Sequence, residues 1–336
     1  MKTSRRNFIT KSALAAAGFS AGLTSMAKAN NITDSFEGSA KINAAKKTDA
    51  FRICIFSKHL QWLDWSEMAM VSAEMGFDGV DLTVRPQGHV LPERVVDDLP
   101  KAMEAVKKAG SNIFMITTAI NDADDPLSEK ILKTAASLGI RHYRMGYFYY
   151  EDDKTIDENL NTIQLKLTRL AKLNEKYSIS GEYQNHSGIS GTGIYFGSPI
   201  WDLGKVLKDI NSHYLGSQYD ICHATVEGFD TWPVGLKLLS RYIGTIDIKD
   251  YQWLKKNGRW TSEAVPLGEG MVDYKKYTAL LKQFNISGPI SIHYEYPLGG
   301  AEHGAKRLTM KRDEVVTVMK KDLETYKSYL QQNGLI

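Results

Sequence analysis

The chain of 336 residues contains only two cysteines, Cys54 and Cys222, and they do not form a C-x-x-C pair. A structural zinc site built on paired cysteines is therefore excluded. Each cysteine lies in an apolar, β-like run (FRICIF and YDICHA), so we expect both to be small buried residues and not disulfide partners. The chain also lacks a Pro-, Gly- or Ser-rich linker, and we expect residues 49–336 to form one domain.

Excess positive charge is missing once the N-terminal segment is set aside. The formal net charge is +3, but residues 1–29 contain five Lys or Arg and no acid, so the remaining chain carries −2. Nucleic acids and anionic membranes are usually bound by a concentrated excess of Lys and Arg. The sequence thus predicts neither partner.

The N-terminal segment has the pattern of an export signal. Arg5-Arg6 lies in SRRNFITK and is followed by the apolar residues 13–23 and then by Ala-Lys-Ala at 27–29. The apolar stretch is too short to span a bilayer. We predict a twin-arginine signal peptide over 1–29, a periplasmic mature protein with no membrane anchor, and a flexible leader over 30–48.

The rest of the chain alternates short β-branched runs with longer amphipathic segments. Strands are expected at 51–56, 79–84, 112–117, 142–145, 180–185, 216–220, 243–248 and 289–293. Helices are expected at 64–75, 93–109, 127–138, 155–177, 200–209, 234–240, 274–284 and 313–332. This alternation predicts a (β/α)8 TIM barrel. A doubly wound open sheet is the competing fold, but it usually has a Gly-rich loop after its first strand, where this chain reads FSKHLQWL.

Polar residues gather at the predicted strand ends, where a barrel of this kind places its chemistry. They are Lys58, His59, Arg85, His89, Thr117, Asn121, Arg144, Glu182, Gln184, His186, Asp220, His223, Asp247, Lys249, Asp250, His293 and Glu295. Residues two apart on a strand share a face, so four neighbouring strands can present oxygen atoms around one point. This pattern predicts a hard divalent cation. A buried ion-pair network around Arg144 and Lys249 is the alternative.

Five motifs follow successive strands: YQNHSG, YDICHATVEG, IDIKDYQW, PLGEGMVDY and ISIHYEYP. In this order they resemble the sugar phosphate isomerase/epimerase family of xylose isomerase-like barrels, and the resemblance covers residues 51–330. It implies one Mn, Mg, Co or Zn ion, held by acidic residues ending strands five, six and eight and by a histidine on strand seven.

The resemblance assigns metal ligands with two departures. Asp220 and Glu295 match the strand-six and strand-eight positions. Gln184 stands where the family has glutamate, and Asp247 stands where it has histidine. Both can still offer oxygen, and the set Gln184, Asp220, Asp247 and Glu295 favours a harder ion such as Mg or Mn. Glu182 and His293 are the alternative ligands, and Glu182 could instead pair with Arg144.

The remaining roles follow partly from the resemblance and partly from position at the predicted barrel mouth. Glu295, His223 and Lys249 are the expected catalytic residues, with Lys249 able to stabilise an enediolate. The expected substrate contacts are His186, Arg85, His89 and Arg144.

These assignments imply removal of a proton α to a carbonyl, as in a sugar isomerase or epimerase. Gln184 cannot act as a second base, which favours one-sided chemistry, and export favours an unphosphorylated sugar or keto-sugar. A lyase or hydratase acting on a 3-keto sugar or glycoside, and a non-catalytic periplasmic sugar-binding protein, remain alternatives. The sequence also leaves a homo-oligomer open.

Overall fold

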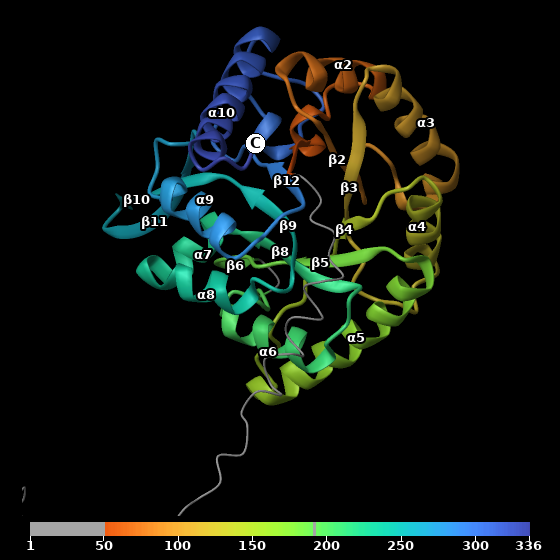
Figure 1. Ribbon diagram of the computed structural model, residues 1–336, viewed down its shortest axis with the longest axis vertical. Helices are drawn as coiled ribbons and strands as arrows, with labels where there is room; N and C mark the ends of the chain where they lie inside the picture. Colours follow the sequence, from red (N-terminus) through yellow and green to blue (C-terminus); the bar gives the residue numbers. More distant parts are fainter. Residues whose placement is uncertain (1–50, 191–192) are drawn as a thin grey trace, which may run out of the picture. The chain divides into compact units, whose positions relative to one another are not determined.

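A computed structural model describes residues 51–190 and 193–336. The predicted signal peptide and leader lie outside these residues. Eight parallel strands close into a barrel in the order β1-β12-β9-β8-β5-β4-β3-β2 (Figure 1). They are β1 (Arg52–Phe56), β2 (Gly79–Val84), β3 (Asn112–Thr118), β4 (His142–Arg144), β5 (Ser180–Gln184), β8 (Leu215–Asp220), β9 (Ile243–Ile248) and β12 (Pro289–Ile292). The predicted TIM barrel is confirmed.

Helices alternate with the strands and lie outside the barrel (Figure 1). They are α2 (Trp65–Met75), α3 (Val95–Lys108), α4 (Pro126–Ser137), α5 (Ile156–Tyr177), α6 (Ile200–Ile210), α7 (Ile221–Gly228), α8 (Trp232–Leu239), α9 (Tyr274–Gln283) and α10 (Arg312–Gln332). Short 3-10 turns occur at η3 (Ser57–Leu60), η4 (Pro92–Arg94), η5 (Phe229–Thr231) and η6 (Ala301–His303). The last helix, α10, packs against both α2 and α9, which joins the two ends of the helical layer.

Local sequence explains where these elements begin and how they pack. Asp64 accepts hydrogen bonds from the backbone N–H groups of Ser66 and Glu67 and so caps α2. Thr155 and Glu158 form a capping box at the start of α5. Strands β2, β8 and β9 are buried along their whole length, as expected for parallel strands covered on both faces. Both cysteines are buried and free, as predicted.

Besides the short 3-10 turns, one helix and two antiparallel strand pairs were not predicted. Helix α7 begins directly after β8, because the side chain of Asp220 accepts a hydrogen bond from the backbone N–H of His223 and caps it. After β9, the strands β10 (Asp250–Lys256) and β11 (Arg259–Val265) form an antiparallel hairpin. A second short antiparallel pair joins β6 (Ile189–Ser190) to β7 (Gly193–Ile194). All three additions follow β5, β8 or β9 and lie next to the polar strand ends.

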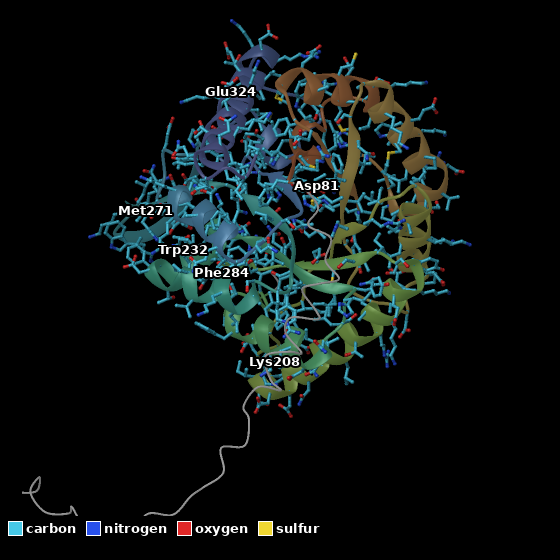
Figure 2. All side chains as sticks on the ribbon, viewed as in Figure 1. Asp81, Lys208, Trp232, Met271, Phe284 and Glu324 are labelled. Atoms are coloured by element: carbon cyan, nitrogen blue, oxygen red, sulfur yellow. The ribbon has the colours of Figure 1, made fainter. Side chains whose placement is uncertain are left out.

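The strands also enclose polar side chains. Asp81 is fully buried among them (Figure 2) and accepts hydrogen bonds from Thr117 Oγ1 at 2.9 Å and Ser291 Oγ at 2.8 Å. Burial raises the pKa of Asp81 to about 7. A hydrogen-bonded acid therefore lies inside the barrel. Across the described part of the chain, no helix combines the length and apolar character needed to cross a membrane.

Candidate active site

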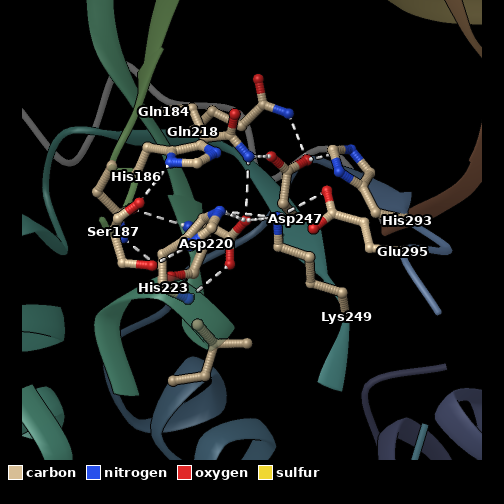
Figure 3. Close-up of polar contacts among 12 residues, drawn as sticks. Gln184, His186, Ser187, Gln218, Asp220, His223, Asp247, Lys249, His293 and Glu295 are labelled. Atoms are coloured by element: carbon tan, nitrogen blue, oxygen red, sulfur yellow. Dashed lines mark hydrogen bonds and ion pairs between the residues drawn. The ribbon is translucent and has the colours of Figure 1, made fainter. Parts of the chain in front are cut away.

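The predicted polar residues of four adjacent strands meet at the carboxyl end of the barrel (Figure 3). Strands β5, β8, β9 and β12 are neighbours in the closed sheet. The register sets Gln184 beside Gln218, Asp220 beside Asp247, and Asp247 beside Ser291, two residues before His293. Because the strands are parallel, their ends place these side chains in one cluster.

Lys249 lies at the centre of this cluster, and its side chain is 3% exposed. Its Nζ is 2.7 Å from His223 Nε2, 3.1 Å from Glu295 Oε1 and 3.2 Å from Asp220 Oδ2. An ammonium group has three N–H donors, so each has one acceptor. Burial alone would lower the pKa of Lys249, but the charges of Asp220 and Glu295 outweigh it and raise this pKa above its ordinary value. Lys249 is therefore a fixed cation.

Glu295 is the most accessible carboxylate bound to Lys249, with its side chain 36% exposed, whereas Asp220 is fully buried. Burial works to raise the pKa of Glu295, but the ammonium of Lys249 holds it well below its ordinary range. Glu295 is thus ionised at neutral pH and can be reached by a ligand.

His223 is held between Lys249 and Ser187. Its Nδ1 lies 2.7 Å from Ser187 Oγ, and its Nε2 faces the Lys249 ammonium. Burial and the charge of Lys249 lower the pKa of His223 well below its ordinary value, so the ring is neutral. Because an ammonium can only donate, Nε2 accepts and Nδ1 carries the proton to Ser187. The ring of His186 packs against His223, with centroids 3.9 Å apart.

The side-chain amide of Gln184 accepts hydrogen bonds through its oxygen and donates hydrogen bonds through its nitrogen to different residues of the site. Its Oε1 accepts from Arg144 Nη1 at 3.0 Å and from the Tyr147 hydroxyl. Its Nε2 donates to Asp220 Oδ2 at 3.0 Å and to Asp247 Oδ2. A guanidinium can only donate, so Arg144 fixes the amide oxygen on its own side and leaves the nitrogen toward Asp220 and Asp247.

Asp247 lies on β9, two residues before Lys249, and is fully buried. Gln218 Nε2 donates to its Oδ1, and His293 Nε2 lies 3.3 Å from the same oxygen. Burial and the nearby Asp220 raise the pKa of Asp247 to about 8. His293 in turn stacks on Phe56, with ring centroids 4.4 Å apart.

The predicted metal ligands meet, but their arrangement does not fit a divalent cation. Within residues 51–190 and 193–336, no three His, Cys, Asp or Glu side chains form a group that could hold a metal ion. Gln184 turns its nitrogen toward the carboxylates, and rotating it would set that nitrogen against Arg144. The Lys249 ammonium already contacts Asp220 and Glu295. A divalent ion sharing these oxygens would face a cation at short range.

Glu182 does not join this cluster, and it pairs with His142 and not with Arg144, the alternative partner considered from the sequence. Its Oε1 lies 3.1 Å from His142 Nδ1. The carboxylate packs against Gly216 and Gly244, where an added Cβ would overlap it. Since Glu182 precedes Gln184 by two residues on β5, it lies one layer deeper inside the barrel.

The predicted substrate residues divide into two groups. His186 and Arg144 belong to the cluster. Arg85 and Arg144 both lie over the Phe56 ring, each with its guanidinium carbon 5.4 Å from the ring centroid. His89 is tied to its own loop, with its backbone N–H donating to Thr83 Oγ1 at 2.9 Å and its Nδ1 3.4 Å from the same oxygen.

Sequence reasoning missed Gln218, Tyr147 and the contact between Ser187 and His223. Gln218 was predictable in principle, because it precedes Asp220 by two residues and so shares its face of the strand. Tyr147 follows β4 in an irregular segment with no periodic signal.

Asp250 fixes the backbone around Lys249. Its carboxylate accepts from the backbone N–H groups of four residues: Tyr251, Gly268, Gly270 and Val272. The Tyr274 hydroxyl donates to the Lys249 carbonyl at 2.7 Å. The motif PLGEGMVDY is thereby clamped to the end of β9, which makes Asp250 a structural residue.

Comparisons with known proteins agree with this fold. The sequence model of the family described as "Xylose isomerase-like TIM barrel" matches residues 71–311. The 3-keto-D-glucoside 4-epimerase of E. coli superposes with a TM-score of 0.60 at 13% identity, over 83% of this chain and 99% of that chain. An L-ribulose 3-epimerase gives 0.63 at 13% identity, over 85% and 96%. The D-psicose 3-epimerase of Clostridium cellulolyticum H10 gives 0.63 at 12% identity, over 83% and 99%.

At these identities the structural likeness shows the fold alone. An uncharacterised protein of Methanocaldococcus jannaschii is 28% identical over 137 residues, which is 41% of this chain. The match spans 43% of that relative's length.

Proposed function

The chain belongs to the xylose isomerase-like TIM barrel family, and from that premise we propose that it is a sugar isomerase- or epimerase-type enzyme. It would remove a proton α to the carbonyl of a sugar or keto-sugar and pass through an enediolate. The observation that carries the proposal is the contact between Lys249 and the accessible, ionised Glu295. Three enzymes of similar fold bear the names of sugar epimerases, which supports this reaction class.

Each partner has a role in the proposed reaction. A substrate carbonyl oxygen that enters between Lys249 and Glu295 would replace Glu295 as the acceptor of one Lys249 hydrogen bond. The carboxylate then accepts the α-proton, the electron pair of the C–H bond forms the C=C bond of the enediolate, and the π pair of the carbonyl moves to its oxygen. Lys249 donates to the oxygen on which negative charge develops, and such a donor is worth about 10²–10³ in kcat. His223 and Asp220 keep the ammonium in place.

The product depends on where the proton returns. Its return to the neighbouring carbon, with transfer of the hydroxyl proton to the former carbonyl oxygen, gives aldose–ketose isomerisation. Return to the opposite face needs a second base, and the Gln184 amide cannot serve as one. Loss of a β leaving group from the same enediolate gives elimination. One-sided chemistry, either isomerisation or lyase/hydratase chemistry, is therefore favoured over epimerisation.

Solvent-deuterium exchange tests the proposal. The purified protein is incubated in D2O with free sugars, 3-keto sugars and glycosides, and the products are followed by NMR. We expect deuterium at the α-carbon of at least one keto-sugar or reducing sugar. Saturable binding without exchange or turnover across the panel would identify a binding protein instead.

We also propose that the mature protein is periplasmic, which the twin-arginine pattern supports. Replacing Arg5 and Arg6 together with lysine should leave the precursor in the cytoplasm, since a receptor reads this pair. Lys11→Arg is the matched control and should be exported normally. Cell fractionation and immunoblotting measure both, and mature periplasmic protein in the double variant would refute the assignment.

A further inference from the structure

A basic cavity lies beside the proposed catalytic residues. It has a volume of about 520 Å³, and its lining includes Lys58, Arg85, His303 and Lys306 but no Asp or Glu. Lys58 follows β1 and Arg85 follows β2, and these two strands are paired. His303 and Lys306 come from the segment after β12. Residues far apart in the sequence thus bring four basic side chains to one hollow.

The two inner cations of this cavity, Lys58 and Arg85, are not paired with an acid in the described part of the chain, although Arg85 lies over the Phe56 ring. Lys58 and Arg85 are partly buried, and neither side chain has a hydrogen bond or ion pair to any residue in the described part of the chain. Lys249, by contrast, has three acceptors. A partly buried charge without a partner is costly, and a bound anion would offset that cost.

The charged groups of the cavity and of the catalytic cluster influence one another's pKa values. Burial lowers the pKa of Lys58 to about 8, with Lys249, Arg85 and Arg144 adding to the shift and Glu295 opposing it. Burial and Arg144 lower the pKa of Arg85 to about 10. Phe56 joins the two regions, because Arg85 lies over its ring and His293 stacks on it.

We propose that this cavity binds an anionic substituent of the substrate, so that the enzyme acts on an acidic sugar. That the anion belongs to a substrate rests on the proposed function. The anion site itself is inferred from Lys58, Arg85 and a lining that contains no Asp or Glu. Carboxylate, sulfate and phosphate groups share the required chemistry, since each accepts charge-assisted hydrogen bonds from ammonium and guanidinium groups.

Matched pairs of ligands test the site. Affinities of the wild-type protein are measured by calorimetry for glucose, glucuronate, glucose 6-sulfate and glucose 6-phosphate. At least one acidic form should bind tenfold or more tightly than glucose, and the preference should shrink as salt is added. The acid with the highest affinity identifies the kind of anionic group that the cavity binds. Equal affinity for glucose and all three acids would overturn the proposal.

Single substitutions locate the preference. Lys58→Met and Arg85→Met should each weaken acid binding about tenfold, the effect of losing one charged hydrogen bond, and should weaken glucose binding much less, so that the acid preference shrinks. Lys208→Met is the control, because this exposed lysine lies on the outer helix α6 (Figure 2). An acid preference that survives both substitutions would place the anion elsewhere.

The pH dependence provides an independent readout. Lys58 is charged below pH 8 and becomes neutral above it, so acid affinity should fall between pH 7 and pH 9. Glu295, Lys249, Arg85 and Arg144 face Lys58, and all four keep their charge over this interval. The fall should persist in Arg85→Met and vanish in Lys58→Met. A fall that persists in Lys58→Met would contradict the role of Lys58.

The two proposals fail separately. If acids bind more tightly than glucose through Lys58 but no sugar exchanges its α-proton, the anion site is supported and the isomerase proposal is refuted. If neutral sugars exchange their α-proton but acids bind no more tightly than glucose, the isomerase proposal is supported and the anion site is refuted.

Discussion

Replacing Glu295 with glutamine should abolish solvent-deuterium exchange at the substrate α-carbon while sparing most of the binding. The amide keeps the shape of the carboxylate but cannot accept the proton, and positioned bases contribute about 10²–10⁴ in rate. The structure supports this role because Glu295 is ionised and is 36% exposed at the side chain. NMR measures the exchange rate, and calorimetry measures the affinity for the same sugar.

The control for this substitution is Glu269→Gln, which removes a carboxylate from an exposed ion pair with Lys321. It should leave exchange unchanged. His223 is the competing base. Full exchange in Glu295→Gln, combined with its loss in His223→Ala, would transfer the role to His223.

The pH profile gives a second check on the same base. A base must be deprotonated to act, so exchange is present above the pKa of Glu295 and lost below it. Since Lys249 holds this pKa well below its ordinary value, the acid limb should lie below the range in which a free glutamate titrates.

The barrel could be predicted because its strands are buried, β-branched and separated by long amphipathic segments. The β10–β11 hairpin was missed although its signal was present. Asn257 and Gly258 form the turn with φ of 49° and 79°, and Asn-Gly between two such runs is a strong hairpin pattern. Helix α7 was missed because it is short and begins directly after Asp220, where only the capping contact marks its start.

The membership of the site could be predicted, but the direction of its hydrogen bonds could not. Parallel strands bring Gln184, Asp220, Asp247 and Lys249 to one end of a barrel whatever the side chains do there. Whether Gln184 presents oxygen or nitrogen depends on Arg144 and Tyr147, which come from a neighbouring strand and an irregular segment. The sequence supplies the residue types, and only the fold shows what each atom faces.

The two departures from the family pattern, Gln184 and Asp247, fit the hydrogen bonds of a cluster that contains the Lys249 ammonium. At position 184 an amide donates to Asp220 and Asp247, and an ionised glutamate would have no N–H to donate to either. At position 247 a carboxylate accepts from Gln184 and Gln218. The ammonium of Lys249 adds a third donor group on Asp220, beside the Gln184 amide and the backbone N–H of His223.

Replacing Lys249 with methionine should lower kcat by about two to three orders of magnitude, because the enediolate oxygen loses its charged donor. The change should also cost about 3–5 kcal/mol of unfolding free energy, since breaking a buried ion pair leaves Asp220 uncompensated. Lys249→Arg keeps the charge and serves as the matched control, with a smaller loss in both quantities. Steady-state kinetics and urea unfolding followed by circular dichroism measure the two effects.

The same variant tests which cation the site uses. If the Lys249 ammonium occupies the position that a divalent ion takes in the family, wild-type protein titrated with Mn²⁺ should show little bound ion by electron paramagnetic resonance. Lys249→Met frees oxygens of Asp220 and Glu295 and should therefore bind Mn²⁺ more tightly than wild type. Exchange by the wild-type protein should survive dialysis against a chelator. Stoichiometric Mn²⁺ in the wild type, displaced by substitution of Asp220, would show instead that the carboxylates serve a metal and that Lys249 only accompanies it.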